Sequence, residues 1–147
     1  MVKIKIKKIH PDAVIPSYEH KGDSGMDVFA THLVIIPPRE RTLIKTGLIF
    51  EIPKGYEVQV RPKSGLALKE GITCLNTPGT IDSNYRGELG VILINHGSKS
   101  YVVNPGQKIA QLVVQKVEEA KFKVVEDVSK TSRGSGGFGS TGLFKNK

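Results

Sequence analysis

Hydrophobic and polar residues alternate along much of this chain with the two-residue period of β-strands. The N-terminal stretch VKIKIK alternates apolar residues with lysine, which is the pattern of a strand with one buried face. Further β-branched runs recur at roughly ten-residue spacing, separated by Pro, Gly and Asn turn signals. These runs lie at 33–36, 42–52, 56–60, 72–75, 91–94, 101–103, 109–114 and 122–125. The pattern predicts an all-β sandwich or barrel.

One stretch has a helical pattern instead. Residues 64–70, with the sequence SGLALKE, suit one or two helical turns. Ser64 is the candidate N-cap, and Gly71 is the residue at which we expect the helix to end.

The composition changes near the C-terminus. The segment TSRGSGGFGSTGLFKNK is rich in Gly and Ser and cannot bury a core of its own. We therefore divide the chain into a β core at 1–130 and a flexible C-terminal arm at 131–147. Phe138 and Phe144 argue against a plain linker, because a solvated linker has no use for large apolar groups.

Composition narrows the class of protein. The 147 residues fit one domain, and a formal net charge of +8 favours anionic partners without choosing among them. The basic residues are scattered, so no nucleic-acid partner is expected. Cys74, the single cysteine, is interpreted as a small core residue in a reducing compartment. With no signal-peptide pattern and no long apolar run, we expect a cytoplasmic protein without a membrane partner.

Five short motifs carry candidate chemistry, although each also occurs in turns and strands that have no function. Asp27, among apolar neighbours, is either an acceptor in a turn or a site group. Two cations before Ser64 mark either an ordinary capped turn or a helix start that binds an anion. The motifs are SGMDVFA (24–30), RPKSGLA (61–67), GTIDSNYRGELGV (79–91), GQKIAQLV (106–113) and RGSGGFGSTG (133–142).

The Gly-rich tail partly matches two known phosphate-binding patterns but fits neither. GSGGFG matches a dinucleotide fingerprint, yet too few residues follow it to build a strand–helix–strand unit. Ser140 stands where a phosphate-binding loop requires lysine. Converging glycine N–H groups and the charge of Arg133 still permit an anion site.

In this order, the five motifs resemble those of the trimeric dUTPase family over about residues 24–142. The resemblance implies a jelly-roll-like β-fold and a homotrimer with three active sites shared between subunits. It also implies that the C-terminal arm closes over a neighbouring subunit's site. The implied activity is hydrolysis of dUTP to dUMP and pyrophosphate with Mg2+. That reaction keeps uracil out of DNA and supplies dUMP for thymidylate synthesis.

The resemblance also implies roles for residues of the YRG motif and its surroundings. Asp82 corresponds to the base that activates the water attacking the α-phosphate in line with the leaving group. Tyr85 corresponds to the ring that packs on deoxyribose and leaves no room for a 2′-hydroxyl. The slot that reads uracil by backbone hydrogen bonds corresponds to Asn76, Gly79, Thr80, Ile81 and Gly90.

Other matching positions are implied to hold the phosphates and the metal. Asp27 corresponds to the aspartate that helps hold Mg2+ through water. In the arm, Arg133 is implied to neutralise the terminal phosphate and Phe138 to stack on uracil, with Gly139 in the glycine cradle. The phosphate contacts correspond to Lys63, Ser64, Gly65 and Gln111. Lys63 departs from the usual arginine, replacing a bidentate fork by a point charge.

Two alternatives remain open at this point. A dCTP deaminase, or a bifunctional deaminase–dUTPase, shares the fold but carries a glutamate at a position that falls on Ile92 here. Ile92 cannot transfer protons. A non-catalytic β-barrel that binds single-stranded nucleic acid would need aromatic platforms. Four Tyr, five Phe and no Trp, mostly at positions that suit a core, supply little for that purpose.

Overall fold

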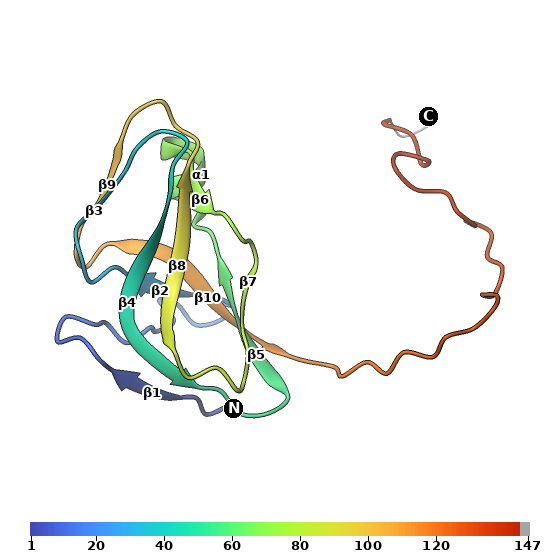
Figure 1. The fold of residues 1–147 in the computed structure, drawn as a ribbon, viewed down its shortest axis with the longest axis horizontal. Helices are drawn as coiled ribbons and strands as arrows, with labels where there is room; N and C mark the ends of the chain where they lie inside the picture. The colour runs from blue at the N-terminus through green and yellow to red at the C-terminus, as the bar shows by residue number, and fades with distance from the viewer. Residues whose placement is uncertain (145–147) are drawn as a thin grey trace.

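Two four-stranded antiparallel sheets and a two-stranded ribbon form the fold of this computed structural model, which describes residues 1–144 (Figure 1). Positions 145–147 of the predicted arm lie outside the described residues. The first sheet has the order β1 (Lys5–Lys8), β4 (Arg41–Glu51), β8 (Glu88–Asn95) and β6 (Ile72–Cys74). The second has the order β2 (Met26–Phe29), β10 (Lys108–Lys116), β5 (Tyr56–Arg61) and β7 (Gly79–Ile81). The ribbon pairs β3 (Val34–Ile36) with β9 (Tyr101–Val103).

The core lies between the two sheets and follows the alternation in the sequence. Along β8, every second residue is buried, including Leu89 and Leu93. These side chains join one hydrophobic cluster with Val58 and Leu112 from the second sheet. Burying each such side chain is worth about 1.5–3 kcal/mol, so this cluster supplies much of the driving force for folding. The arrangement confirms the predicted all-β, jelly-roll-like fold.

Seven of the β-branched runs coincide with strands, but the prediction for 122–125 is wrong. The structure has no strand there, and Phe122 and Val124 are exposed. An apolar run becomes a strand only where a neighbouring strand can take up its backbone hydrogen bonds. In the described chain, β10 ends at Lys116, and the N–H of Val117 makes a last bond to the carbonyl of Gly55 at 3.0 Å. Beyond it the chain runs away from the barrel (Figure 1).

The short helix α1 (Ser64–Glu70) is where the sequence predicts it, but its start differs. The N-cap is Lys63, not Ser64, and it makes no side-chain capping bond. The predicted end is confirmed, because Gly71 has φ 68°, a left-handed conformation that glycine adopts without strain. Within residues 1–144, no helix is long and apolar enough to cross a membrane.

Candidate active site

Asp27 is the centre of a charged cluster on the second sheet. It lies on β2 directly opposite Gln111 of β10. Lys63 Nζ donates to Asp27 Oδ1 from the loop before α1, and Lys108 Nζ donates to Oδ2 at 2.7 Å from β10. Lys108 also lies 3.5 Å from a carboxylate oxygen of Glu19. Three segments that are distant in sequence therefore meet at one carboxylate.

The two lysines determine the protonation state of Asp27. Burial alone would raise the pKa of this carboxyl, but the hydrogen bonds from Lys108 and Lys63, with their positive charges, hold the pKa below its ordinary value. The same contact with Asp27 raises the pKa of Lys108. At neutral pH the cluster is therefore one carboxylate between two ammonium groups.

A hollow of about 340 Å³ opens beside this cluster. Gln111 reaches into it and anchors its amide by donating from Nε2 to the carbonyl of Pro62 at 3.1 Å. A Cβ at position 25 would collide with Oε1 of Gln111, so a larger residue there would displace the Gln111 amide. Ser64 and Gly65 directly follow Lys63 as the first residues of α1. The hollow is lined by Ser17, Glu19, Asp23, Ser24, Gly25, Asp27 and Gln111.

The residues of the YRG motif line a different hollow, of about 230 Å³, next to the β7–β8 hairpin. Tyr85 Oη donates to the carbonyl of Glu88 at 3.0 Å. Arg86 Nη1 donates to the carbonyls of Ser83 at 2.7 Å and Tyr85 at 2.9 Å, so it fixes the tip of the hairpin. The lining residues are Leu43, Thr80, Ile81, Asp82, Tyr85, Glu88, Gly90 and Ile92.

Asn76 and Gly79 lie at the start of this hairpin. A Cβ at position 79 would be 3.6 Å from Nδ2 of Asn76 and 3.2 Å from Cβ of Val60. The backbone of β7 therefore passes close to both side chains. Each of these residues offers one main-chain carbonyl and one N–H group, and the absent side chain of Gly79 leaves the backbone accessible for recognition.

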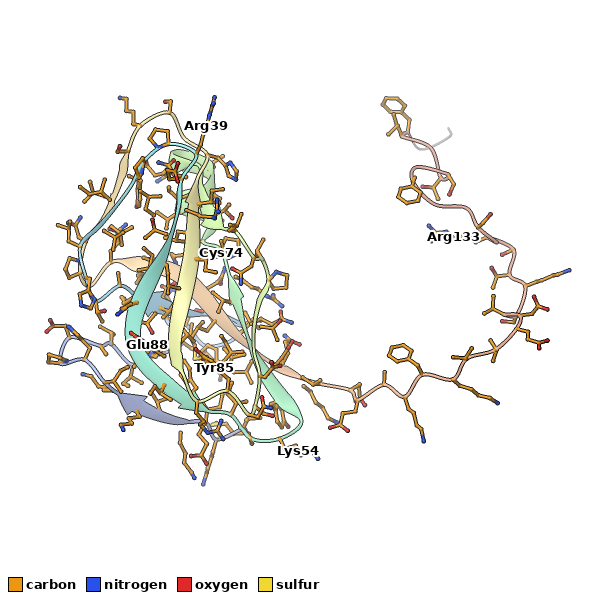
Figure 2. All side chains as sticks on the ribbon, viewed as in Figure 1. Arg39, Lys54, Cys74, Tyr85, Glu88 and Arg133 are labelled. Carbon is orange, nitrogen blue, oxygen red and sulfur yellow. The ribbon has the colours of Figure 1, made fainter. Side chains whose placement is uncertain are left out.

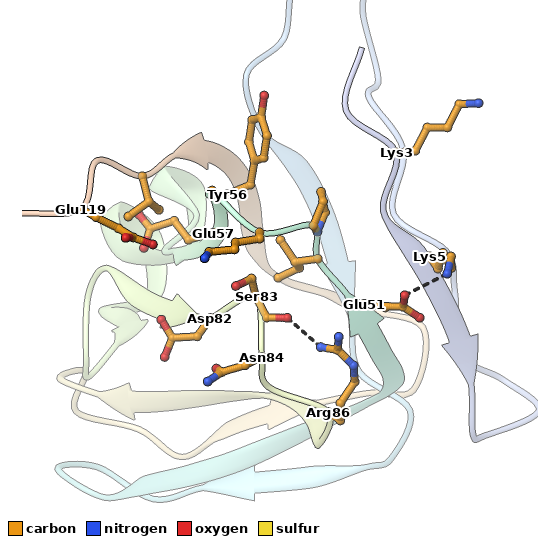
Figure 3. Close-up of a pocket in the computed structure, with 15 residues that line it drawn as sticks. Lys3, Lys5, Glu51, Tyr56, Glu57, Asp82, Ser83, Asn84, Arg86 and Glu119 are labelled. Atoms are coloured by element: carbon orange, nitrogen blue, oxygen red, sulfur yellow. Dashed lines mark hydrogen bonds and ion pairs between the residues drawn. The ribbon is translucent and has the colours of Figure 1, made fainter.

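Asp82 also borders a second and larger depression, of about 910 Å³ (Figure 3). Ser83, Asn84 and Arg86 share this depression, and Lys5 on its far side pairs with Glu51 at 2.8 Å. The carboxylate is thus open to solvent and can meet a water molecule. In a single chain, strands β10 and β5 lie between β2, which carries Asp27, and β7 of the Asp82 hairpin, at about 4.8 Å per strand spacing.

The arm residues lie apart from both hollows. Figure 2 shows Arg133 on the arm, away from the barrel. Its Nε donates to the carbonyl of Gly136 at 2.8 Å, and Phe138 is fully exposed. Phe138 and Gly139 both have positive φ, at 46° and 91°. The structure therefore does not bring Arg133, Phe138 or Gly139 to the other candidate residues within one chain.

The donor set around Asp27 suits a magnesium ion that is held mainly by other ligands. In the described part of the chain, no three His, Cys, Asp or Glu side chains are grouped to hold a metal. Mg2+ commonly takes one or two carboxylates and completes its shell with water and substrate phosphates. Asp27 in an open hollow fits that use, with Lys63 and Lys108 as competing partners.

Two residues of this region were not found from the sequence. Lys108 lies within the GQKIAQLV motif, but its partner is known only once β10 is paired with β2. Glu88 lies in the YRG motif close to Asp82 and Tyr85, but the sequence assigns it no role, because its partner Gly47 lies on another strand. Cys74, in contrast, is buried as expected, and burial raises the pKa of its thiol to about 11, which leaves it unreactive.

Comparisons of the sequence and the fold with known proteins consistently give dUTPases. The dUTPase family model matches residues 12–142. A deoxyuridine 5′-triphosphate nucleotidohydrolase from Picosynechococcus is 57% identical over 139 residues, covering 95% of this chain and 98% of the relative. A Staphylococcus bacteriophage 80alpha dUTPase with dUPNHPP superposes with a TM-score of 0.89 at 29% identity, covering 96% of this chain and 99% of the other.

A second solved structure is informative about metal. A mutant dUTPase from phage phi11 of S. aureus, described as coordinating a structural Mg(II) ion, superposes with a TM-score of 0.79 at 26% identity. The match covers 85% of this chain and 97% of that one.

Proposed function

The chain belongs to the dUTPase family, and we propose that it hydrolyses dUTP to dUMP and pyrophosphate, with Asp82 activating the attacking water. The observation that carries the proposal is the hollow at the β7–β8 hairpin, where Asp82, Tyr85 and Gly90 line one surface. A general base must lie within hydrogen-bond reach of the water that it deprotonates. Asp82 is the carboxylate that opens both to this hollow and to solvent.

The hairpin is the part of the molecule that recognises the nucleoside. Uracil lies against the backbone of 79–81 with Asn76 beside it, and Gly90 lines the same hollow as the hairpin. Cytosine reverses the donor and acceptor at two positions and would leave buried polar groups unpaired. Tyr85 packs on deoxyribose and excludes a 2′-hydroxyl by steric overlap.

The Asp27 cluster is the part that binds the triphosphate. Lys63 contacts Asp27 and is followed by Ser64 and Gly65 at the start of α1, and the amide of Gln111 contacts the neighbouring Pro62. Such donors suit phosphate oxygens. Asp27 would help to hold Mg2+ through water beside the phosphates, and the bound ion would supply positive charge opposite the leaving pyrophosphate.

The active enzyme is a homotrimer in which neighbouring chains complete each site. Two observations support this: the hairpin and the Asp27 cluster lie in separate hollows of one chain, and the arm leaves its own barrel. The arm, residues 131–147, reaches a neighbouring subunit. There Arg133 meets the terminal phosphate, Phe138 stacks on uracil and Gly139 belongs to the turn that supplies backbone N–H groups.

We place this activity in the cytoplasm, where it removes dUTP before it enters DNA and supplies dUMP for thymidylate synthesis. A deaminase is not favoured by the site. Ile92 lines the hairpin hollow where a deaminase of this fold needs a proton-transferring glutamate. A non-catalytic nucleic-acid-binding barrel is not favoured either, because the dUTPase family model matches residues 12–142 and the similar proteins are named as nucleotidohydrolases.

The test is pyrophosphate release measured with Mg2+ against dUTP, UTP, dTTP and dCTP. We expect turnover of dUTP and little turnover of the other three. Ammonia released from dCTP would instead indicate a deaminase. Absence of turnover together with retention on single-stranded DNA at physiological salt would indicate a binding module.

A further inference from the structure

The carboxylate of Glu88 is bound to the backbone of the neighbouring strand. Gly47 N–H donates to Glu88 Oε1 at 2.9 Å. This contact lies where the β4–β8 pairing shifts register: Lys45 is opposite Gly90, whereas Ile49 is opposite Glu88. Three residues of β4 therefore face one residue of β8. A bulge of this kind takes backbone groups out of the ladder, and Glu88 supplies the acceptor that Gly47 needs.

The bulge at Gly47 is held by close packing and by hydrogen bonds. Gly47 has φ +70°, and a Cβ there would be 2.6 Å from Cβ of His10 and 2.9 Å from Cβ of Ala13. The carbonyl of Gly47 accepts the N–H of Ile9 at 2.8 Å. Thr46 Oγ1 donates to the carbonyl of Leu89 at 2.6 Å and ties the same bulge to β8. The N-terminal segment and β8 thus hold Gly47 from opposite sides.

The main chain of Glu88 in turn positions Tyr85. Tyr85 Oη donates to the Glu88 carbonyl at 3.0 Å, so the ring folds back toward its own hairpin. A Cβ at position 87 would be only 2.5 Å from Cζ of Tyr85, which shows that the ring lies directly over Gly87. The direction of the ring therefore depends on where the Glu88 peptide is held. Figure 2 shows both residues at the same end of the barrel.

We propose that Glu88 is a positioning residue for sugar discrimination: its side chain, bound to the β4 bulge at Gly47, fixes the peptide that orients the Tyr85 ring. The proposal rests on the proposed function, in which that ring excludes ribonucleotides. Glu88 acts through an acceptor oxygen and not through its charge. The geometry of the bond, and not the ionisation of the carboxylate, therefore determines the effect.

Three substitutions separate geometry from charge. Glu88→Gln removes the charge but keeps an acceptor oxygen at the same reach, so kcat/KM for dUTP and its ratio to that for UTP should stay within about two-fold of wild type. Glu88→Asp keeps the charge but is one methylene too short, and Glu88→Ala removes the acceptor. Both should lower the dUTP-to-UTP ratio by roughly 3- to 10-fold, the scale of one hydrogen bond.

A double-mutant cycle tests the route through Tyr85. In a Tyr85→Phe background, which lacks the Oη donor, Glu88→Ala should cost little further discrimination. Glu40→Ala, which removes an exposed carboxylate just before β4, is the matched control and should leave the ratio unchanged. Circular dichroism and solution mass identify variants that fail to fold. If Glu88→Ala is among them, the dUTP-to-UTP ratios of Glu88→Asp and Glu88→Gln still test whether geometry or charge determines discrimination.

Opposite results would overturn the inference. If Glu88→Asp and Glu88→Ala lower the melting temperature but leave the dUTP-to-UTP ratio at the wild-type value, Glu88 is only structural. If Glu88→Gln loses discrimination as fully as Glu88→Ala, charge is what matters and the positioning role is wrong. Failure of the proposed function itself is recognised separately, because the wild-type chain would then show no preference for dUTP.

Discussion

Lys108 Nζ and Asp27 Oδ2 lie 2.7 Å apart, on two strands that neighbour each other in the second sheet. Lys63 contacts the other oxygen of Asp27. The Asp27 side chain is only 19% exposed, and its carboxylate lies between two ammonium groups. The stability of the fold should therefore depend on the protonation of Asp27.

We expect Asp27 to stabilise the fold at neutral pH and to stop doing so in acid. Its pKa in the folded chain is below the ordinary value of 3.8, so the unfolded chain binds the proton more readily. Stability from this group is therefore present above that value and is lost as pH falls below it. Wild type should exceed Asp27→Asn in free energy of unfolding by on the order of 1 kcal/mol at pH 7.

Denaturant unfolding from pH 7 to pH 2 measures that difference. The gap between wild type and Asp27→Asn should close as pH falls below the ordinary aspartate range. Lys108→Met should reduce the gap at neutral pH, whereas Lys116→Met, at the exposed far end of β10, should not. A gap that is constant over the whole range would mean that the ion pairs do not stabilise the fold.

Asp82→Asn should keep the fold and the binding of dUTP while losing most turnover. The amide has the shape of the carboxylate but cannot take a proton from water, so the loss should fall on kcat and not mainly on KM. Steady-state kinetics with an independent measurement of dUTP binding checks this. Asp127→Asn, an exposed carboxylate on the segment after β10, is the control. Activity within a few-fold of wild type would assign the base to another group.

Tyr85→Ala should relax discrimination against ribonucleotides. Removing the ring opens space for a 2′-hydroxyl, so UTP turnover should rise relative to dUTP turnover. The measurement is the ratio of the two kcat/KM values, and the ring merely packs if that ratio is unchanged. Tyr101→Ala is a poor control, because Tyr101 Oη accepts a bond from Gln107 and packs on the core. Tyr18→Ala, at an exposed tyrosine, is a better one.

The chain should be a trimer in solution, with a mass of about 48 kDa against 16.0 kDa for one chain. Sedimentation equilibrium or light scattering gives the mass directly. The reason is that one chain keeps the hairpin and the Asp27 cluster in separate hollows. A 16 kDa species with full activity would show that a single chain completes the site.

A structural feature could be predicted from the sequence when it depends only on residues that are close together along the chain. The alternation in β8 predicts a strand because both the strand and its buried face are written into consecutive residues. Strands β2 and β7 are missed because they have four and three residues and include Asp27 and Gly79, which are rare in strands. The Lys108–Asp27 pair is missed because it exists only through the pairing of β10 with β2.

The same distinction between local and long-range features applies to the candidate site. The resemblance supplied residue roles, but it could not supply the bond from Gly47 to Glu88, which follows from a register shift between β4 and β8. The strand predicted at 122–125 is absent for the opposite reason: its local pattern is right, but among the described residues its long-range pairing is missing. Its apolar residues satisfy the local pattern, but in the described chain they find no strand to pair with. Local pattern is therefore necessary for a strand but not sufficient.

Truncation after Lys130 is the sharpest test of the arm. It removes Arg133, Phe138 and Gly139 but no strand of the barrel, since β10 ends at Lys116. In the described part of the arm, the hydrogen bonds of residues 131–144 are made to one another. The melting temperature and the solution mass should therefore stay near those of the full chain.

The chemistry should respond differently to the same truncation. The arm is proposed to exclude water and to set a positive charge against the departing pyrophosphate, so kcat/KM for dUTP should fall by at least ~10-fold. Phe138→Ala should reproduce part of that loss, whereas Phe144→Ala, at another exposed phenylalanine of the arm, should not. A non-hydrolysable dUTP analogue should also protect the wild-type arm from proteolysis after Arg133. If the truncated enzyme hydrolyses dUTP at the full rate, the arm is a linker, because neither its charge nor its ring can then take part in the reaction.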